Sequence, residues 1–155
     1  MKKPSLADLA NLAEIVGAIA IIISLVYVGQ ELRANTAAVK AASLQSITNS
    51  SSASMLAVVE SRDFADIRLQ GDHDPTQLSE ADKLRYVLYE RQMWLHFQNV
   101  WTQWKLGVID DGVWAGYQKV VCDELVGTDA RLTWWNQNHA YSLSDGFTKL
   151  VRGCR

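Results

Sequence analysis

Few side chains in this 155-residue sequence have types and spacings that could support chemistry. Asp72, His73 and Asp74 offer two carboxylates and an imidazole that could bind a divalent cation. No third or fourth ligand lies nearby, and Asp residues in such a segment also stabilise turns. The sequence therefore predicts neither a metal site nor a cofactor. It also lacks a nucleophile elbow, a phosphate-binding loop and a dinucleotide fingerprint, which disfavours an enzyme.

An aromatic helix face offers a second place for chemistry. Trp94, Phe97, Trp101 and Trp104 recur at intervals of three and four residues, which places them on one side of a helix. This spacing is typical of a face buried in the core, although such a face can also line a ligand pocket. For a pocket between this helix and the next, the candidate residues are Glu90, Trp94, His96, Trp101, Trp104 and Tyr117, with Gln98 as a further polar contributor.

Cys122 and Cys154 are the two cysteines of the chain. They form no CxxC or zinc-type pattern with histidine. We interpret them as two thiols in a reducing compartment, while a disulfide in the periplasm is the alternative.

The N-terminal region contains a candidate membrane span. Residues 15–29 carry no charged side chain, and the apolar stretch extends back to Leu9 with Asn11 and Glu14 as polar interruptions. A bilayer core of about 30 Å requires about 20 mostly apolar residues, so residues 9–29 are long enough. The alternative is a helix buried in a soluble bundle. A cleaved signal peptide is disfavoured, because two acids precede the apolar block and no small-residue cleavage site closely follows it.

Small residues line one side of this span. Close backbone approach drives helix association in lipid, so this side is a candidate interface with a second copy or another membrane protein. The interface residues are Ala13, Glu14, Gly17, Ala20 and Ser24. Glu14 could serve a proton or ion path, but we interpret it as a carboxylate at the headgroup level near the N-terminus of the helix.

Basic residues flank the span almost evenly, with Lys2 and Lys3 before it and Arg33 and Lys40 after it. Such a balance gives little information on the orientation of the span in the membrane. Our interpretation favours a C-terminal domain in the cytoplasm. The chain is expected to cross a membrane once. The whole chain has 15 basic and 17 acidic residues, so it lacks the basic surface typical of nucleic-acid binding.

The segment AEIVGAIAIIISLVYVGQELRANTAAVKAASLQ, residues 13–45, carries a family resemblance. It resembles the opening of a group of short, uncharacterised bacterial single-pass membrane proteins, in which an apolar helix leads into a Gln-x-x-Arg-x-Asn-Thr-like juncture. Here that juncture is Gln30, Arg33, Asn35 and Thr36. The later GVIDDGVW, residues 107–114, is similar to a turn and helix start in the group. The resemblance implies a single-pass anchor in a bacterial inner membrane and a helical domain, and no activity.

Helical signals dominate the rest of the chain, and no strand pattern is convincing. Alanine-rich sequence predicts a helical stalk after the span, but the serines of 49–54 predict a hinge or a new helix start. Later helices are expected over about 63–70, ending at Gly71; over 81–106, starting near Ser79 and ending at Gly107; from Asp110 or Asp111; and from Ser144.

The sequence thus predicts an all-α protein with four parts: an N-terminal tail (1–8), a transmembrane helix (9–29), a stalk (30–60) and a Trp-rich helical domain (61–155). Our first hypothesis is a non-enzymatic, membrane-anchored protein that oligomerises or binds a partner. The alternative is a small-molecule-binding domain of sensory or enzymatic type. A third is ion or proton passage through an oligomeric helix bundle.

Overall fold

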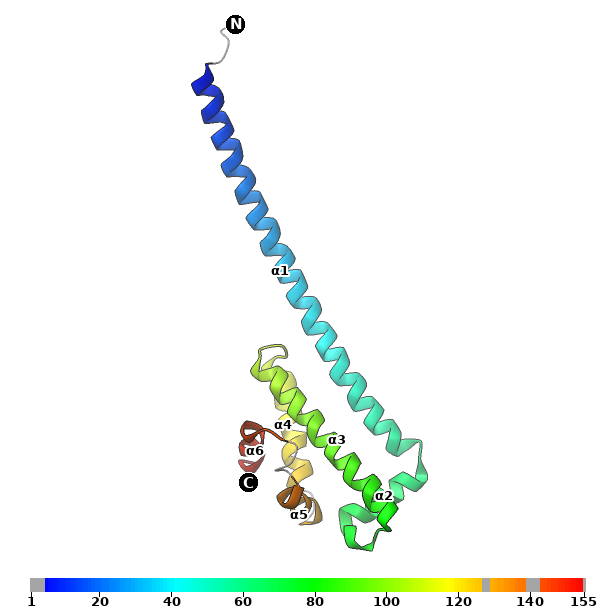
Figure 1. Cartoon of the computed structure of the whole chain (residues 1–155). Helices are drawn as coiled ribbons and strands as arrows, with labels where there is room; N and C mark the ends of the chain where they lie inside the picture. The colour runs from blue at the N-terminus through cyan, green and yellow to red at the C-terminus, as the bar shows by residue number, and fades with distance from the viewer. Residues whose placement is uncertain (1–4, 127–128, 139–142, 155) are drawn as a thin grey trace. The chain divides into compact units, whose positions relative to one another are not determined.

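A computed structural model describes residues 5–126, 129–138 and 143–154 (Figure 1). Every regular element in these ranges is a helix, so the predicted all-α fold class is confirmed. The chain divides into two compact units, Met1–Ala41 and Ala42–Arg155. The elements are α1 (Leu6–Val59), α2 (Arg62–His73), the 3-10 helix η1 (Pro75–Gln77), α3 (Glu80–Lys105), α4 (Asp111–Val126), α5 (Asp129–Asn138) and α6 (Asp145–Arg152).

The first unit consists of the N-terminal part of α1. The described side chains in this unit are all exposed, including Ile15, Ile22 and Leu25. An 18-residue window of α1 has a mean hydropathy of 2.3, and none of it is buried inside the fold. This helix is long and apolar enough to cross a membrane.

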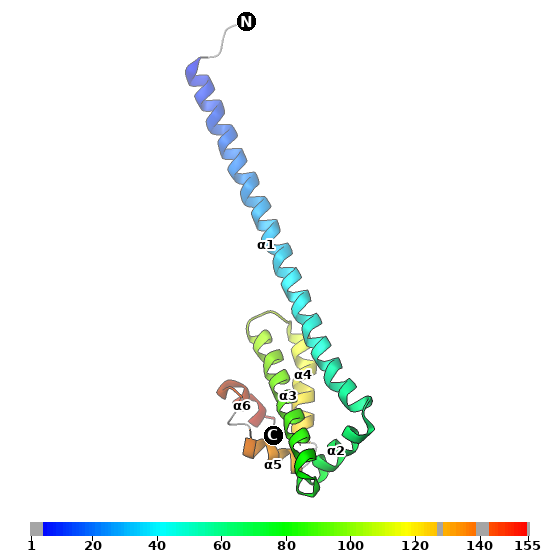
Figure 2. The ribbon, with the colours of Figure 1, turned by 45° about the vertical axis from the view of Figure 1, so that its right-hand side comes forward.

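The second unit packs α2 to α6 with residues 42–59 of α1. In both views α3 and α4 lie side by side (Figures 1 and 2). The larger core cluster joins five helices around Trp94 and Trp135, whose ring centroids are 4.4 Å apart. A smaller cluster joins Ile47 of α1 to Val100 and Trp114. The division between the units therefore falls within the segment predicted as the stalk, because Ile47 packs with the helical domain.

Two helix starts follow the expected capping chemistry. Ser79 Oγ accepts a hydrogen bond from the backbone N–H of Asp82 and donates one to its carboxylate. Asp110 Oδ1 accepts from the backbone N–H of Val113 and so caps α4. Gly107 follows α3 with φ of 69°, a conformation that glycine adopts without strain. The predicted boundaries of α3 are therefore within one residue of the observed ones.

The predicted hinge or helix start at residues 49–54 is wrong, because α1 continues without interruption to Val59. Serine favours non-helical structure by bonding to its own backbone, but tertiary contacts outweigh that preference here. Ser51 bonds to side chains of α3 and α4, and Ser54 donates to the Ser50 carbonyl while accepting from Gln92. The serines therefore form a polar helix face that meets the domain.

The predicted end of the second helix at Gly71 is also wrong. Gly71 lies inside α2, which continues to His73. A Cβ atom at Gly71 would lie 2.5 Å from the ring of Tyr86. The glycine therefore serves close packing of α2 on α3 rather than helix termination.

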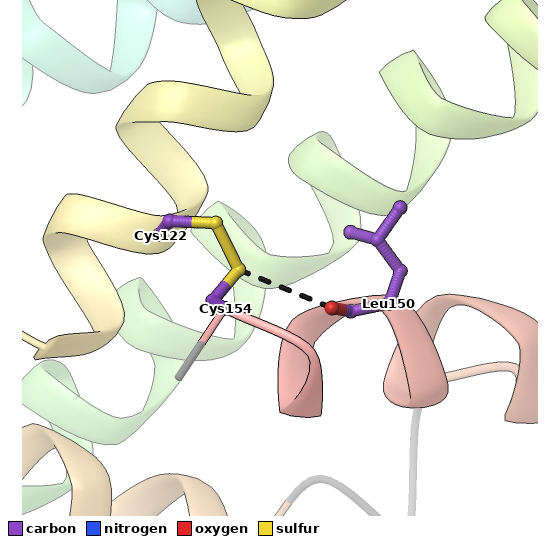
Figure 3. The surroundings of a disulfide bond; sticks show 3 residues. All are labelled: Cys122, Leu150 and Cys154. Carbon is purple, nitrogen blue, oxygen red and sulfur yellow. Dashed lines mark hydrogen bonds between the residues drawn. A yellow bond between two sulfur atoms is a disulfide. The ribbon is translucent and has the colours of Figure 1, made fainter.

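Cys122 and Cys154 form a disulfide (Figure 3), which corrects the interpretation of two free thiols. Their Cα atoms are 5.2 Å apart, within the range that a disulfide requires. The bond links α4 to the end of α6, and Cys154 Sγ lies 3.9 Å from the Leu150 carbonyl oxygen. No spacing pattern in the sequence indicates this disulfide, because the two cysteines are 32 positions apart and the turn after α6 brings them together.

Candidate functional site

The second unit contains a cleft of about 780 Å³, within the size range of small-molecule sites. It lies between the C-terminal part of α1, α3 and α4, with one residue from α2, and we call it the α1/α3/α4 cleft. Met55 and Val59 are 66% and 78% exposed, so they lie at its rim. The residues that line it are Ser51, Ser54, Met55, Val58, Val59, Arg68, Tyr89, Met93, His96, Phe97, Gly112, Val113, Gly116, Tyr117 and Val120.

Two glycines on α4 line this cleft. Gly112 and Gly116 are four residues apart, so they lie on the same face of the helix. A glycine within a helix costs about 0.5–1 kcal/mol relative to alanine. A Cβ atom at Gly116 would meet nothing within 4 Å, so a larger side chain there would enter open space. The absence of a side chain at Gly116 therefore creates volume in the cleft.

Three polar side chains, one each from α1, α3 and α4, meet at the wall of the cleft. Ser51 Oγ of α1 lies 2.9 Å from His96 Nε2 of α3 and 3.1 Å from the hydroxyl of Tyr117 on α4. Ser51 Oγ thus links the other two groups within a mainly apolar surface. The Ser51–His96–Tyr117 trio is thus a fixed polar spot to which a ligand hydroxyl or carbonyl could bond.

The trio has only some of the groups that nucleophilic catalysis requires. Burial lowers the pKa of His96, so its imidazole is neutral at neutral pH and could act as a base toward Ser51. However, His96 Nδ1 has no hydrogen-bond partner that would orient the ring. Ser51 also lies within a continuous helix, whose backbone N–H groups are engaged in helical bonds rather than free to form an oxyanion hole. The arrangement favours binding over acyl transfer.

The buried imidazole predicts a loss of stability on acidification. The unfolded chain takes up a proton at His96 near its ordinary pKa of 6.5, whereas the folded chain resists it. Stability contributed by this group is therefore present above pH 6.5 and decreases as the pH falls below it. Urea unfolding of the wild type and His96→Gln between pH 7 and pH 5 should show the steeper decline in the wild type. Parallel curves would contradict this assignment.

A partly buried ionic cluster lies beside the cleft. Asp72 of α2 accepts two hydrogen bonds from Arg131 of α5, at 2.9 and 2.7 Å, and one from the hydroxyl of Tyr86 at 3.0 Å. Arg68 Nε is 3.6 Å from the same carboxylate. Burial raises the pKa of Glu90, the nearby arginines oppose this rise, and the charge of Asp72 adds to it. The cluster ties α2, α3 and α5 together.

The structure distributes the predicted pocket residues over several sites. His96 and Tyr117 line the cleft together, as the hypothesis of a pocket between α3 and α4 requires. Glu90 and Trp94 face a separate void of about 10 Å³ that also contacts Arg131. Trp101 packs against Phe147 in the core. Trp104 stacks on Trp114, with its indole N–H donating to Asp111. Gln98 Oε1 accepts from the backbone N–H of Ser144 and is also outside the cleft lining.

The predicted interface face of α1 is exposed throughout. This holds for Ala13, Glu14, Gly17, Ala20 and Ser24. Ser24 Oγ donates to the Ala20 carbonyl, so its hydroxyl is satisfied within the helix. A Cβ atom at Gly17 would meet nothing within 4 Å. The interface therefore stays a prediction.

The sequence analysis did not identify three important residues of the cleft. Ser51 lies in the segment interpreted as a hinge, Gly116 lies in a helix without a special pattern, and Arg68 lies on a short polar helix. The spacing of Gly112 and Gly116 inside a helical segment was the available signal, because glycine is otherwise unfavourable there.

Comparison with known proteins gives no relative for this arrangement: no protein-family model matches the chain, and neither does any curated protein or solved structure.

Proposed function

We propose that this protein is a membrane-anchored binding protein that holds a small, largely apolar molecule in the α1/α3/α4 cleft. The observation that carries the proposal is the cleft itself, a mainly apolar cavity with a polar spot in its wall. Such a combination is typical of small-molecule sites, in which apolar area supplies affinity and a few polar groups set orientation. The N-terminal part of α1 serves as the anchor, and residues 42–155 form the binding domain.

A labelling experiment with matched variants tests the cleft. A neutral alkyl alcohol with a diazirine on its chain is irradiated with full-length protein in nanodiscs, and labelled peptides are identified by mass spectrometry. We expect labels on residues 51–59 and 112–120 in the wild type. Gly116→Leu should reduce this labelling at least about tenfold, because its side chain fills the cavity.

The matched control is Gly116→Ala, which adds only one methyl group and should retain labelling. It should also raise the stability by about 0.5–1 kcal/mol, as alanine does in helices. Labels confined to residues 9–29, and equal in the wild type and Gly116→Leu, would refute the proposed function.

The disulfide supports an assignment of the membrane side. Disulfides form and persist outside the reducing cytoplasm, whereas the basic residues flanking the span are balanced. We therefore place the amino terminus in the cytoplasm of a bacterium and residues 42–155 on the oxidising side of its inner membrane, opposite to the cytoplasmic location that the sequence favoured.

Fusion reporters test this orientation. Alkaline phosphatase joined after Arg155 should be active in cells, because it requires an oxidising compartment, while a green fluorescent protein fusion at the same point should be dark. The reverse pair of results would place the domain in the cytoplasm.

The exposed small-residue face around Gly17 is available to a second copy or to another membrane helix. Association through this face is part of the proposal, since small residues permit close helix packing in lipid. It is independent of the cleft.

A further inference from the structure

The hydrogen atoms of the Ser51–His96–Tyr117 trio determine which ligand group its polar spot can bind. Ser51 Oγ is 2.9 Å from His96 Nε2 and 3.1 Å from the Tyr117 hydroxyl, so two hydrogen bonds join three polar groups. A serine and a tyrosine hydroxyl each carry one hydrogen, and a neutral imidazole carries one on either nitrogen. Burial lowers the pKa of His96, so its ring is neutral at pH 8. The position of the imidazole hydrogen therefore decides the direction of both hydrogen bonds.

The surroundings of His96 favour a hydrogen on Nε2. Nδ1 is buried and, in the part of the chain that the structure describes, has no hydrogen-bond partner. His96 is 7% exposed, so its ring is largely shielded from water. A buried N–H group without a partner is rare in proteins, because it loses its hydration and gains no bond. With the hydrogen on Nε2, the imidazole donates to Ser51 Oγ and only a lone pair remains at Nδ1.

A chain of donors then runs from His96 through Ser51 to Tyr117. His96 donates to Ser51, and Ser51 donates to Tyr117, because a hydroxyl that accepts a hydrogen bond becomes a stronger donor. Tyr117 ends this chain and lines the cleft, and its own hydroxyl hydrogen has no acceptor among the described residues. Three hydrogens serve two bonds, so the trio offers a ligand one hydrogen-bond donor.

The rest of the cleft lining favours a neutral ligand group without a hydrogen of its own. Ser54 Oγ already donates to a backbone carbonyl of α1 and accepts from Gln92. Arg68, the charged residue of the lining, donates to Tyr89 and lies 3.6 Å from Asp72. No carboxylate lies among the described residues of the lining, so a ligand O–H or N–H finds no strong acceptor there. An ionised ligand group would lose hydration in this mainly apolar cleft.

We infer that the ligand is a neutral carbonyl compound, a ketone or an ester with an apolar chain, whose carbonyl oxygen accepts a hydrogen bond from the Tyr117 hydroxyl. This inference rests on the proposed function and specifies the ligand class. Apolar side chains of α1, α3 and α4, among them Val58, Phe97 and Val120, surround the chain. An alcohol of the same length binds less tightly, because its own hydroxyl hydrogen has no acceptor at the polar spot.

Matched probes separate the carbonyl group from the chain. Full-length protein in nanodiscs is irradiated at pH 8 with 2-dodecanone, 2-dodecanol or dodecane, each carrying a diazirine at the same chain position. We expect the ketone to label residues 51–59 and 112–120 at about tenfold lower concentration than the alcohol, a factor typical of one polar hydrogen left unpaired. Equal labelling by ketone and alcohol would overturn the inference and leave the proposed function standing. If no probe labels these residues above Gly116→Leu, the proposed function fails with it.

Two tyrosine variants that lose the same atom test the donor. Tyr117→Phe should remove most of the preference for ketone over alcohol, because the Ser51 hydroxyl can then donate to the backbone of its own helix. Retained dodecane labelling shows that the variant is folded. Tyr89→Phe is the matched control and should keep the preference, since its hydroxyl lines the same cleft but bonds to Arg68. The inference is wrong if Tyr117→Phe keeps the preference or if Tyr89→Phe abolishes it.

Nitrogen NMR tests the position of the hydrogen in the wild type itself. In protein labelled with ¹⁵N-histidine, His96 Nε2 should have the chemical shift of a protonated nitrogen and Nδ1 that of an unprotonated one. His96→Gln identifies which signals belong to this residue. A hydrogen on Nδ1 would overturn the inference even where a tyrosine variant fails to fold. In that case Ser51 donates to His96 and Tyr117 to Ser51, so no hydroxyl hydrogen remains for a ligand.

Discussion

Replacing Asp72 with Asn should lower the free energy of unfolding by about 3 kcal/mol, because it removes one partner of a partly buried charge network. Asp72 and Arg131 have side chains that are 19% and 11% exposed, and two short hydrogen bonds join them. Without the carboxylate, the guanidinium of Arg131 would lose two charge-assisted hydrogen bonds at a site that is largely shielded from water. The value lies at the lower end for such losses, since Asp72 is not fully buried.

Urea unfolding of full-length protein in nanodiscs, followed by tryptophan fluorescence, measures this loss. Asp63→Asn is the matched control, because Asp63 pairs with Arg85 at an exposed site, and its stability should hardly change. Removing both charges with Asp72→Asn and Arg131→Gln should cost less than the sum of the single losses. Equal losses for Asp72→Asn and Asp63→Asn would mean that the buried cluster adds no stability.

Removing the disulfide should have an effect of similar size. The Cys122→Ala, Cys154→Ala double variant should lose about 3–4 kcal/mol, the value that loop-closure entropy gives for a separation of 32 residues. The bond joins α4 to α6, and α6 contributes Phe147 and Val151 to the core. Without the bond, α6 would separate from the core more readily.

The same urea experiment with and without a phosphine reductant measures this effect. Reductant should destabilise the wild type by the amount lost in the double variant, and it should leave the variant unchanged. A wild type insensitive to reductant, with a double variant within about 0.5 kcal/mol of it, would show that the cross-link is dispensable.

The two stability predictions and the binding proposal depend on different parts of the fold. The ionic cluster and the disulfide hold α2 to α6 together, whereas the cleft requires the polar face of α1 to meet α3 and α4. Variants at Gly116 change the cleft without touching either stabilising feature. Binding and stability can therefore be measured separately.

Local signals in the sequence determined much of the helical architecture. The apolar stretch at 9–29 predicted a helix able to cross a membrane. The capping residue Ser79 and the terminating Gly107 marked the two ends of α3, and Asp110 marked the start of α4. These features depend on residues within a few positions of one another, so the sequence alone reveals them. The aromatic spacing on α3 likewise predicted a core-facing surface, to which Trp94 and Phe97 belong.

Tertiary structure decided the features that join distant segments. Ser51 lies 45 positions from His96 and 66 from Tyr117, and their contact overrides the weak helix preference of the serine segment. By its type, Gly71 indicated a helix end, but in the structure its lack of a side chain allows Tyr86 to pack against it. Cys122 and Cys154 are brought together by the position of α6 beside α4. Side-chain packing across helices sets these contacts, and no periodicity along one helix records which other helix it will meet.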